Sequence, residues 1–435
     1  MWNVTTRVGF LVLWLVAPSF AWAQPPPPTR NRTQPKTTQL SEFGRVQAIA
    51  YAYKHNPKLL AFRARLRKAL ARFKGSQVYP NNPTISASGG VQLPETGPGS
   101  LLPRVSANLS LALPVGGRWG KKQLWAKAQF ERVKTEWTLR KFQLALQIHR
   151  AWNKMVVAQQ QHKLRIVISA FLQRLAKLTR ARIKQGVGNQ LELQLALASE
   201  LRATQARLDA GALYRQRKQQ VGALLGHPNV AALRFQHGAL PAPVKAPSLS
   251  SLLRKSMPRH PRLQLARAVL KQSQNGLRWQ QAKAIPDLTV SLGYSLEDGA
   301  HVVTGGLSIP LPLFWRNQGG IGQQRARIQQ AQRLLISQRY QLRQKMKQAL
   351  THYQNDLVVL RIFRQRLQSA KAQFNLIEKG LKLGVFTPFQ TLTAQRSIVG
   401  SQLQQLQLVS HALTHYLEVC EAAGVLPAWG RRQQP

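Results

Sequence analysis

Hydrophobic residues recur with two different periods along this chain of 435 residues. Beyond position 40, most of the chain places apolar residues at steps of three and four, which predicts amphipathic helices. Four shorter segments instead alternate apolar residues with small polar ones, which is typical of strands that bury one face. These segments are 84–93, 105–115, 288–296 and 302–313.

The four predicted strands contain no Asp, Glu, Lys or Arg, although 18% of the whole chain is charged. Each is about 9–12 residues long, which is the length of a tilted strand that crosses a membrane. A charge on the lipid face of such a strand would cost about 2–4 kcal/mol at the membrane midplane. The pattern therefore favours membrane strands, and an ordinary soluble antiparallel sheet is the alternative.

The predicted helices are unusually long. Neither Gly nor Pro occurs from Lys121 to Gln185 or from Gln323 to Lys379, and continuous helices over these stretches would extend roughly 98 and 86 Å. Each stretch ends near a Gly-Val pair and is followed by a second helical segment, 189–225 or 388–423. We therefore expect two long antiparallel helical hairpins. Their apolar residues recur about every 3.5 positions, as in a left-handed coiled coil.

The chain is internally duplicated. LSLALPV at 109–115 matches LSIPLPL at 307–313, and Gly186-Val187 matches Gly384-Val385 at the same offset of 198 residues. TISASGGVQL after Pro83 corresponds to DLTVSLGYSL after Pro286. We therefore predict two repeats with the same order of elements: the first is 40–234, with the strand pair 84–115, and the second is 235–426, with the strand pair 288–313.

The N-terminal segment predicts export. A short region with Arg7 precedes an apolar run of 14 residues and the motif Ala21-Trp22-Ala23, which predicts signal cleavage between Ala23 and Gln24,. The predicted signal peptide is 1–23, a Pro-rich tether follows at 24–39, and 427–435 is a polar tail,. An uncleaved N-terminal anchor is the alternative.

Charge and cysteine content narrow the function. The chain has 63 Lys and Arg against 14 Asp and Glu, a net charge of +49, and one cysteine, Cys420. One cysteine excludes an intramolecular disulfide framework. A charge this high first suggests a nucleic-acid partner, but an exported protein has little access to nucleic acid. This counts against the nucleic-acid interpretation, which we keep as the alternative function: an exported basic coiled-coil protein that binds nucleic acid or another polyanion. So few carboxylates also predict a stability that changes little as the pH falls.

Four strands cannot close a barrel by themselves, and open sheet edges are not tolerated in lipid. Two copies would supply eight strands and three copies twelve, and eight is about the minimum for a membrane barrel. The expected fold is therefore mainly α with a small β-barrel part, in which long helical hairpins continue from four membrane strands per chain and association with further copies closes the barrel.

Several segments resemble the TolC-like outer membrane efflux family. "AIAYAYKHNPKLLAFRARLRKA" (48–69) is similar to the family's opening helix, and "LALPVGGRWGKKQLWAKA" (111–128) to its strand-to-helix join. "RIKQGVGNQLELQLALA" and "LKLGVFTPFQTLTAQ" resemble its hairpin tips. The phrase "PLPLFWRNQGG" (310–320) is similar to the branch that serves cobalt–zinc–cadmium resistance pumps. The resemblance extends over residues 40–426.

This resemblance implies a homo-trimer in the cell outer membrane, with its helical part in the periplasm. It implies a passive exit duct that joins a periplasmic adaptor protein and an inner-membrane pump of the resistance–nodulation–division type, with heavy-metal cations as a candidate cargo. It assigns adaptor docking to the hairpin tips, at Gly186, Val187, Gly188, Gly384, Val385, Phe386 and Thr387.

One departure weakens the metal cargo. Several family members narrow the periplasmic mouth with a ring of aspartates. Over 364–384 the only acid of this chain is Glu378, among five Lys and Arg residues. A cation-selective gate is therefore not carried over from the family.

No catalytic or cofactor motif is legible. "VGGRWGKK" at 115–122 lacks the first Gly and the Ser/Thr of a phosphate-binding loop,. His411, His415 and Glu418 lie at helical spacing that can hold zinc, but such groups are more often packed or solvated. We therefore expect no enzyme activity, no cofactor, no metal site and no nucleic-acid partner.

Overall fold

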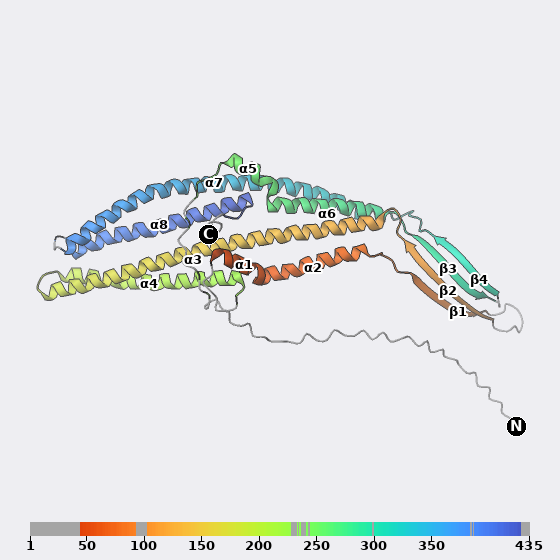
Figure 1. The fold of residues 1–435 in the computed structure, drawn as a ribbon, viewed down its shortest axis with the longest axis horizontal. Coiled ribbons are helices and arrows are strands. Elements are labelled where there is room, and N and C mark those ends of the chain that lie inside the picture. Colours follow the sequence, from red (N-terminus) through yellow and green to blue (C-terminus); the bar gives the residue numbers. More distant parts are fainter. Residues whose placement is uncertain are drawn as a thin grey trace, which may run out of the picture. The chain divides into compact units, whose positions relative to one another are not determined.

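The computed structural model describes residues 44–427 except 93–101, 228–232, 234, 236–240, 242–243, 298–299, 383–384 and 386. Six helices longer than 20 residues and four strands dominate this part of the chain (Figure 1). The predicted signal peptide, its cleavage site, the tether and nearly all of the polar tail lie outside the described residues.

The elements follow one order twice. The first series is α1 (Arg45–His55), α2 (Pro57–Gln77), β1 (Thr84–Gln92), β2 (Leu102–Leu113), α3 (Arg118–Lys184) and α4 (Gln190–Leu225). The second series is α5 (Leu249–Ser256), the 3-10 turn η1 (Met257–Arg259), α6 (Pro261–Lys283), β3 (Leu288–Glu297), β4 (Ala300–Ser308), α7 (Gln318–Lys382) and α8 (Pro388–Ala423). The prediction of continuous long helices is confirmed, because α3 has 67 residues and α7 has 65.

Proline and a capping side chain mark several helix starts. The Asn56 side chain accepts a hydrogen bond from the Leu59 amide, and Pro57 occupies the first turn of α2. His260 and Pro261 do the same for α6, where the ring accepts from the Arg262 amide. A proline in the first turn loses no helical hydrogen bond, because that amide has no partner within the helix. The sequence therefore fixes these helix starts locally.

The four strands form one antiparallel sheet in chain order, β1-β2-β3-β4. Hairpins join β1 to β2 and β3 to β4, whereas β2 pairs with β3 across 174 intervening residues, from Leu113 to Leu288. The predicted last strand was too long, because β4 ends at Ser308. Pro310 and Pro312 lack the amide hydrogen that a ladder needs, which accounts for the earlier end.

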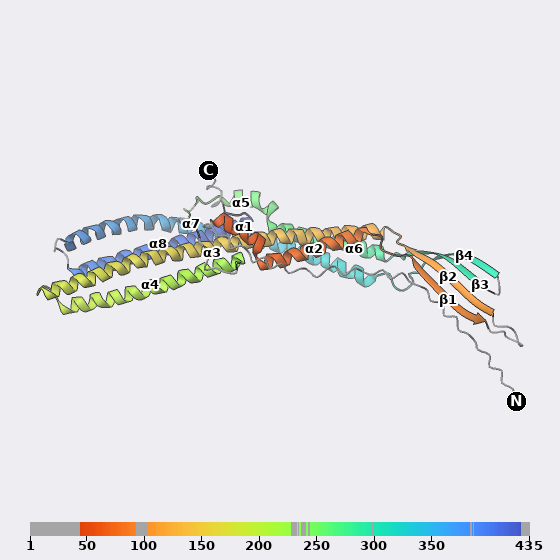
Figure 2. The same ribbon diagram turned by 60° about the horizontal axis from the view of Figure 1, so that its bottom comes forward.

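The helices form two hairpins, α3 with α4 and α7 with α8, as predicted (Figures 1 and 2). A shared apolar cluster joins the hairpins, with Ile168, Leu172 and Leu175 of α3, Ala203 of α4 and Leu392 of α8. Nearer the sheet, α3 packs against both α2 and α6, and α6 packs against α7. In this region α7 therefore has a helix on one side only, among the described residues.

The end of each returning helix packs against the start of a shorter helix. Gly226, after α4, has φ 75° and lies against the Asn56-Pro57 step, while Asn56 Nδ2 donates to the Leu224 carbonyl at 2.8 Å. Gly424, after α8, has φ 67° and lies against the His260-Pro261 step. We call these contacts the first and second knuckles. Gly226 and Gly424 are again 198 positions apart.

Candidate functional site: the sheet, its joins and the hairpin tips

One face of the sheet is apolar across all four strands. The pairing register places Ile85 opposite Leu109, Leu109 opposite Leu292, and Val290 opposite Leu307. Leu307 is 75% exposed and Ile85 is 78% exposed, so the described residues leave much of this face uncovered. An exposed apolar face of this extent marks a surface that meets lipid or protein.

The opposite face of the sheet carries mostly small, polar side chains. Ser88 and Ser106 hydrogen-bond across β1 and β2 at 2.8 Å, and Asn108 lies opposite Gly293. Its one ion pair among the described residues joins Arg104 to Glu297 at 2.9 Å. The strict alternation predicted from sequence therefore separates an apolar face from a hydrophilic one. In the part of the chain that the structure describes, no helix has the length and hydropathy to cross a membrane.

The join between β2 and α3 is covered by its own chain. Arg118 pairs with Asp287 at 2.7 Å, in the segment that leads into β3. The Trp119 indole donates to the Ser76 carbonyl at 3.1 Å, and its ring meets Tyr79 edge-on. A side chain at Gly116 would collide with Ile285. The "VGGRWGKK" segment is therefore a packing turn, not a phosphate cradle.

The corresponding join between β4 and α7 is covered only in part. Asn317, which matches Trp119 at the offset of 198 residues, is buried, and its Nδ2 donates to the Gln280 carbonyl at 2.8 Å. Phe314 is 92% exposed and Trp315 is 67% exposed, and both follow the exposed side chains of Ile309, Leu311 and Leu313. Arg316 Nε donates to the Pro312 carbonyl instead of to a carboxylate. The residues before Asn317 thus present an exposed apolar surface, whereas the corresponding Leu111, Leu113 and Val115 of the first join are half-buried.

The predicted docking tip of the first hairpin is a Schellman turn. Gly186 has φ 76°, its amide donates to the Ile183 carbonyl, and the Val187 amide donates to the Arg182 carbonyl at 2.9 Å. Gly188 has φ 143°. Glycine occupies these positions because other residues are strained there.

The second tip repeats this bond. The Val385 amide donates to the Gly380 carbonyl at 2.8 Å, and Thr387 caps α8 by accepting from the Gln390 amide. Gly384 and Phe386, also predicted for docking, lie outside the described residues. The structure thus describes five of the seven predicted docking residues.

Each tip also carries an exposed apolar pair, one residue in the turn and one in the next helix. The pairs are Val187 with Leu191, and Val385 with Phe389, and all four side chains are more than half exposed. Leu191 and Phe389 were absent from the predicted docking set. Their shared offset of 198 residues was the signal that could have found them.

The second knuckle contains a cluster of charged side chains around Glu421. Glu421 accepts from Arg262 at 2.7 Å and from Arg150, while His260 Nε2 lies 3.1 Å from the Glu421 carbonyl. Burial lowers the pKa of His260, and Arg262 adds to this effect against the opposing bond to Glu421. On α3, burial and then the nearby Arg45 charge lower the pKa of His149 to about 3. Both imidazoles are therefore held neutral.

His415, one of the three residues whose spacing could hold zinc, instead contacts side chains of α7. His415 Nδ1 lies 2.6 Å from Asp356 Oδ2, and its ring stacks on His352. Among the described residues, no group of three or more His, Cys, Asp or Glu side chains can hold a metal ion. Cys420 is buried, and burial raises the pKa of its thiol to about 12. These side chains pack the α7–α8 hairpin.

Comparison with known proteins follows the same division of the chain. The family model described as "Outer membrane efflux protein" matches residues 48–227 and again 252–425. The two matches together cover most of the chain, and each contains one strand pair and one helical hairpin.

Individual proteins agree with the family match. The cobalt-zinc-cadmium resistance protein CzcC of Cupriavidus metallidurans is 25% identical over 310 residues, which are 69% of this chain and 72% of CzcC. The crystal structure of CusC superposes with a TM-score of 0.73 at 16% identity and covers 89% of this chain and 94% of CusC. The outer membrane protein VceC of Vibrio cholerae gives 0.72 at 19% identity, over 88% and 96% of the two chains.

Proposed function

Because the chain belongs to the outer membrane efflux protein family, we propose that it is the outer-membrane exit duct of a tripartite efflux system. Membership of this family makes it a transport protein and not an enzyme. In the proposal, a pump of the resistance–nodulation–division type and a periplasmic adaptor deliver cargo to the duct, and the helices lie in the periplasm. The continuous apolar face of the sheet carries this proposal. It also argues against the alternative of a soluble polyanion-binding protein.

The proposed duct is a homo-trimer. Within the described part of the chain, strands β1 and β4 pair on one side only, and a sheet edge in lipid has to be closed. Three copies would supply twelve strands in a continuous ring. The duplicated element order supports this arrangement, since β4 of one copy and β1 of the next would repeat the pairing of β2 with β3.

The proposed ring predicts a specific register. Leu109 pairs with Leu292 inside the chain. The corresponding residues under the sequence repeat are Leu307 and Gly89. In the double variant Leu307→Cys/Gly89→Cys, we therefore expect oxidation to link the copies into a covalent trimer on denaturing gels.

The control is Leu307→Cys/Ser88→Cys, because a shift of one residue puts the second cysteine on the opposite face of the sheet. Cross-linking only of the control pair, or of neither pair in membranes, would contradict the proposed closure. Native Cys420 is buried and should not react.

We also propose that the exposed apolar pairs at the tips bind the adaptor. Val385→Asp/Phe389→Asp should abolish efflux in cells that lack the native gene, because the charges would have to be desolvated at an apolar contact. Val302→Ser, on the polar sheet face, is the matched control. Equal amounts of protein in the outer membrane and unchanged single-channel conductance would show that the duct itself is intact, and unchanged efflux would refute tip docking.

The cargo class follows from the relative CzcC, whose name records cobalt, zinc and cadmium resistance. We propose metal as the cargo of this duct. Deleting the gene should lower the tolerated concentration of these metals, and the full-length gene should restore it. Unchanged tolerance to all three metals would exclude this cargo.

A further inference from the structure

Three helical segments next to the sheet contain many basic residues and no acidic residue. They are α2, α6 and the first part of α7, residues 318–355. Together they carry 19 Lys and Arg residues: seven on α2, five on α6 and seven on this part of α7. Such a concentration of one charge exceeds what solubility alone requires.

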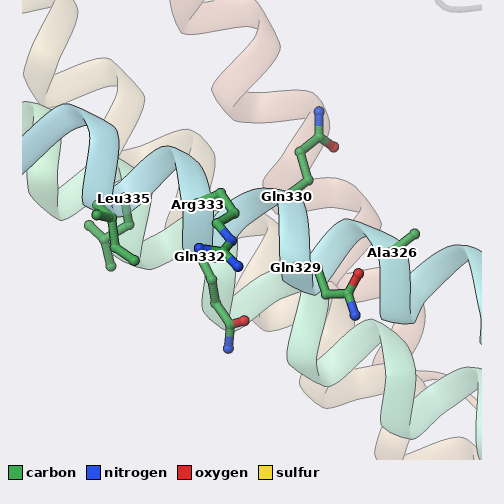
Figure 3. Close-up of a pocket in the computed structure, with 7 residues that line it drawn as sticks. Ala326, Gln329, Gln330, Gln332, Arg333 and Leu335 are labelled. Carbon is green, nitrogen blue, oxygen red and sulfur yellow. The ribbon is translucent and has the colours of Figure 1, made fainter.

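The exposed surface of α7 extends nearly all round the helix. Only one stripe is buried against its neighbours, marked by Gln324, Ala331 and Leu342. Opposite that stripe, Arg333 lies in an open hollow of about 790 Å³ whose lining side chains all come from α7 itself (Figure 3). The hollow therefore has no opposite wall among the described residues.

Both flanks of α7 are basic. At 100° per residue, Arg325, Arg339 and Arg343 lie on one flank, and Arg327 and Lys345 lie on the other. All five side chains are exposed. In a tube whose wall is built of helices, one flank of α7 faces the lumen and the other faces outward. Whichever flank of α7 faces the lumen, guanidinium or ammonium groups therefore line the lumen there.

The carboxylates of this region are already neutralised. On the facing part of α3, residues 118–155, the only acids are Glu131 and Glu136. Glu131 pairs with Lys271 at 3.1 Å. Glu136 lies 3.4 Å from Arg65 and is flanked by two further arginines on its own helix. No acid of these four segments is left to attract a mobile cation.

We infer that the assembled duct conducts anions in preference to cations, with the helical wall next to the sheet as the selective region. The inference rests on the proposed exit-duct function. Rings of Lys and Arg select anions in pores, and a wall of one sign raises the local concentration of the opposite ion by about tenfold or more. Metal cargo would then cross as a complex with anionic ligands and not as a bare divalent cation.

The test uses the full-length chain in planar bilayers of neutral phosphatidylcholine with a tenfold KCl gradient. At about 0.1 M salt we expect chloride to be about tenfold more permeant than potassium. The preference should fall near 1 M salt, where the Debye length shrinks from about 10 Å to about 3 Å. Equal permeability or a preference for potassium would overturn the inference. A complete lack of conductance would instead count against the exit duct.

Charge reversal identifies the flank that acts. Arg325→Glu/Arg339→Glu/Arg343→Glu changes one flank, and Arg327→Glu/Lys345→Glu changes the other. One variant should reduce the chloride preference at least about threefold, as expected for removal of part of a wall potential of several kT, and the other should leave it nearly unchanged. An unchanged preference in both would overturn the assignment of selectivity to this region.

Single cysteines keep the inference testable if charge reversal prevents assembly. Arg325→Cys and Arg327→Cys can be treated with thiol reagents of equal size that carry a negative or a positive charge. The variant whose cysteine lines the lumen is the one in which reaction with either reagent blocks the conductance. In that variant, the anionic reagent should react several-fold faster than the cationic reagent. A faster reaction with the cationic reagent would refute the inference. Buried Cys420 gives little background.

Discussion

Residues 109–119 and 307–317 follow the same sequence pattern, but their own chain covers the first strand-to-helix join more fully than the second. Trp119 is held by Ser76 and Tyr79, and its counterpart Asn317 is held by Gln280. Trp315, which corresponds to Gly117, is largely exposed. Ile309, Leu311 and Leu313 are also exposed. In the first series of elements the corresponding residues Leu111, Leu113 and Val115 are half-buried. A surface that is bare in one repeat and packed in the other therefore locates the contact that the proposed neighbouring copy would make.

The largest effect is expected at the knuckles, where both repeats are packed. In Gly226→Ala the new methyl carbon would lie 2.6 Å from the His55 carbonyl oxygen, and in Gly424→Ala 2.7 Å from Pro261 Cδ. Both positions also require positive φ. We expect each variant to lose about 2–4 kcal/mol of stability, with the greater loss at Gly226 because a backbone atom blocks the methyl group.

Thermal unfolding followed by circular dichroism in detergent measures this loss. Gly75→Ala is the matched control, because nothing lies within 4 Å of its added carbon on α2. Alanine there should leave stability unchanged or raise it by up to about 1 kcal/mol. Knuckle variants as stable as this control would contradict the packing described.

The two joins should respond differently to loss of their tryptophans. Trp119→Ala removes a half-buried ring and its hydrogen bond, so the folded chain should lose about 2 kcal/mol, less than a fully buried tryptophan. Trp315→Ala should change the unfolding of the separate chain by no more than about 0.5 kcal/mol and weaken the association of copies. Native mass spectrometry in detergent, together with thermal unfolding, separates the two outcomes. If both substitutions destabilised the separate chain equally, the proposed difference between the two joins would be wrong.

Acid should affect the second knuckle more than the first. His260 has a lowered pKa in the folded chain, so the unfolded chain takes up a proton first, near pH 6.5. Stability is therefore complete above this pH and falls by about 1.4 kcal/mol per pH unit below it, until the folded ring is protonated. His260→Asn, which copies Asn56 of the first knuckle, should remove this part of the acid dependence. Unfolding at pH 7 and pH 5 measures it, and an unchanged pH dependence would contradict the assignment.

The lowered pKa values of His260 and His149 argue against the expectation that so few carboxylates make stability insensitive to acid, which stays a prediction. That expectation counted carboxylates and overlooked buried neutral histidines. Burial depends on contacts between distant segments, such as His260 with Glu421, and these are not visible in the local pattern.

The smallest effect distinguishes the two arginines of the joins. Arg118→Gln should cost about 1 kcal/mol or less, because its pair with Asp287 is partly exposed to solvent,. Arg316→Gln should have almost no effect on the separate chain, since Arg316 donates to a carbonyl of its own turn. Chemical denaturation of both variants measures these losses of stability. A larger loss for Arg316→Gln than for Arg118→Gln would contradict the prediction.

Local sequence signals predicted most of the fold. The long helices were recognisable from the absence of Gly and Pro, and the strands from alternation, because both signals depend on neighbours along the chain. The end of β4 was predicted too late in the chain, although Pro310 and Pro312 indicate where the strand ends. The exposed pairs at the tips and the packed glycines of the knuckles were also missed, because they depend on which surfaces meet in three dimensions.

The pairing of β2 with β3 has a consequence for the order of folding. Joining Leu113 to Leu288 closes a loop of 174 residues, and closing so long a flexible chain is entropically unfavourable and slow. If α3 and α4 first fold back on each other, the ends of this loop approach before the strands pair. The hairpins are local structures that can form in water. In the proposed outer-membrane duct, the sheet should then be completed last, when its strands meet lipid and neighbouring copies.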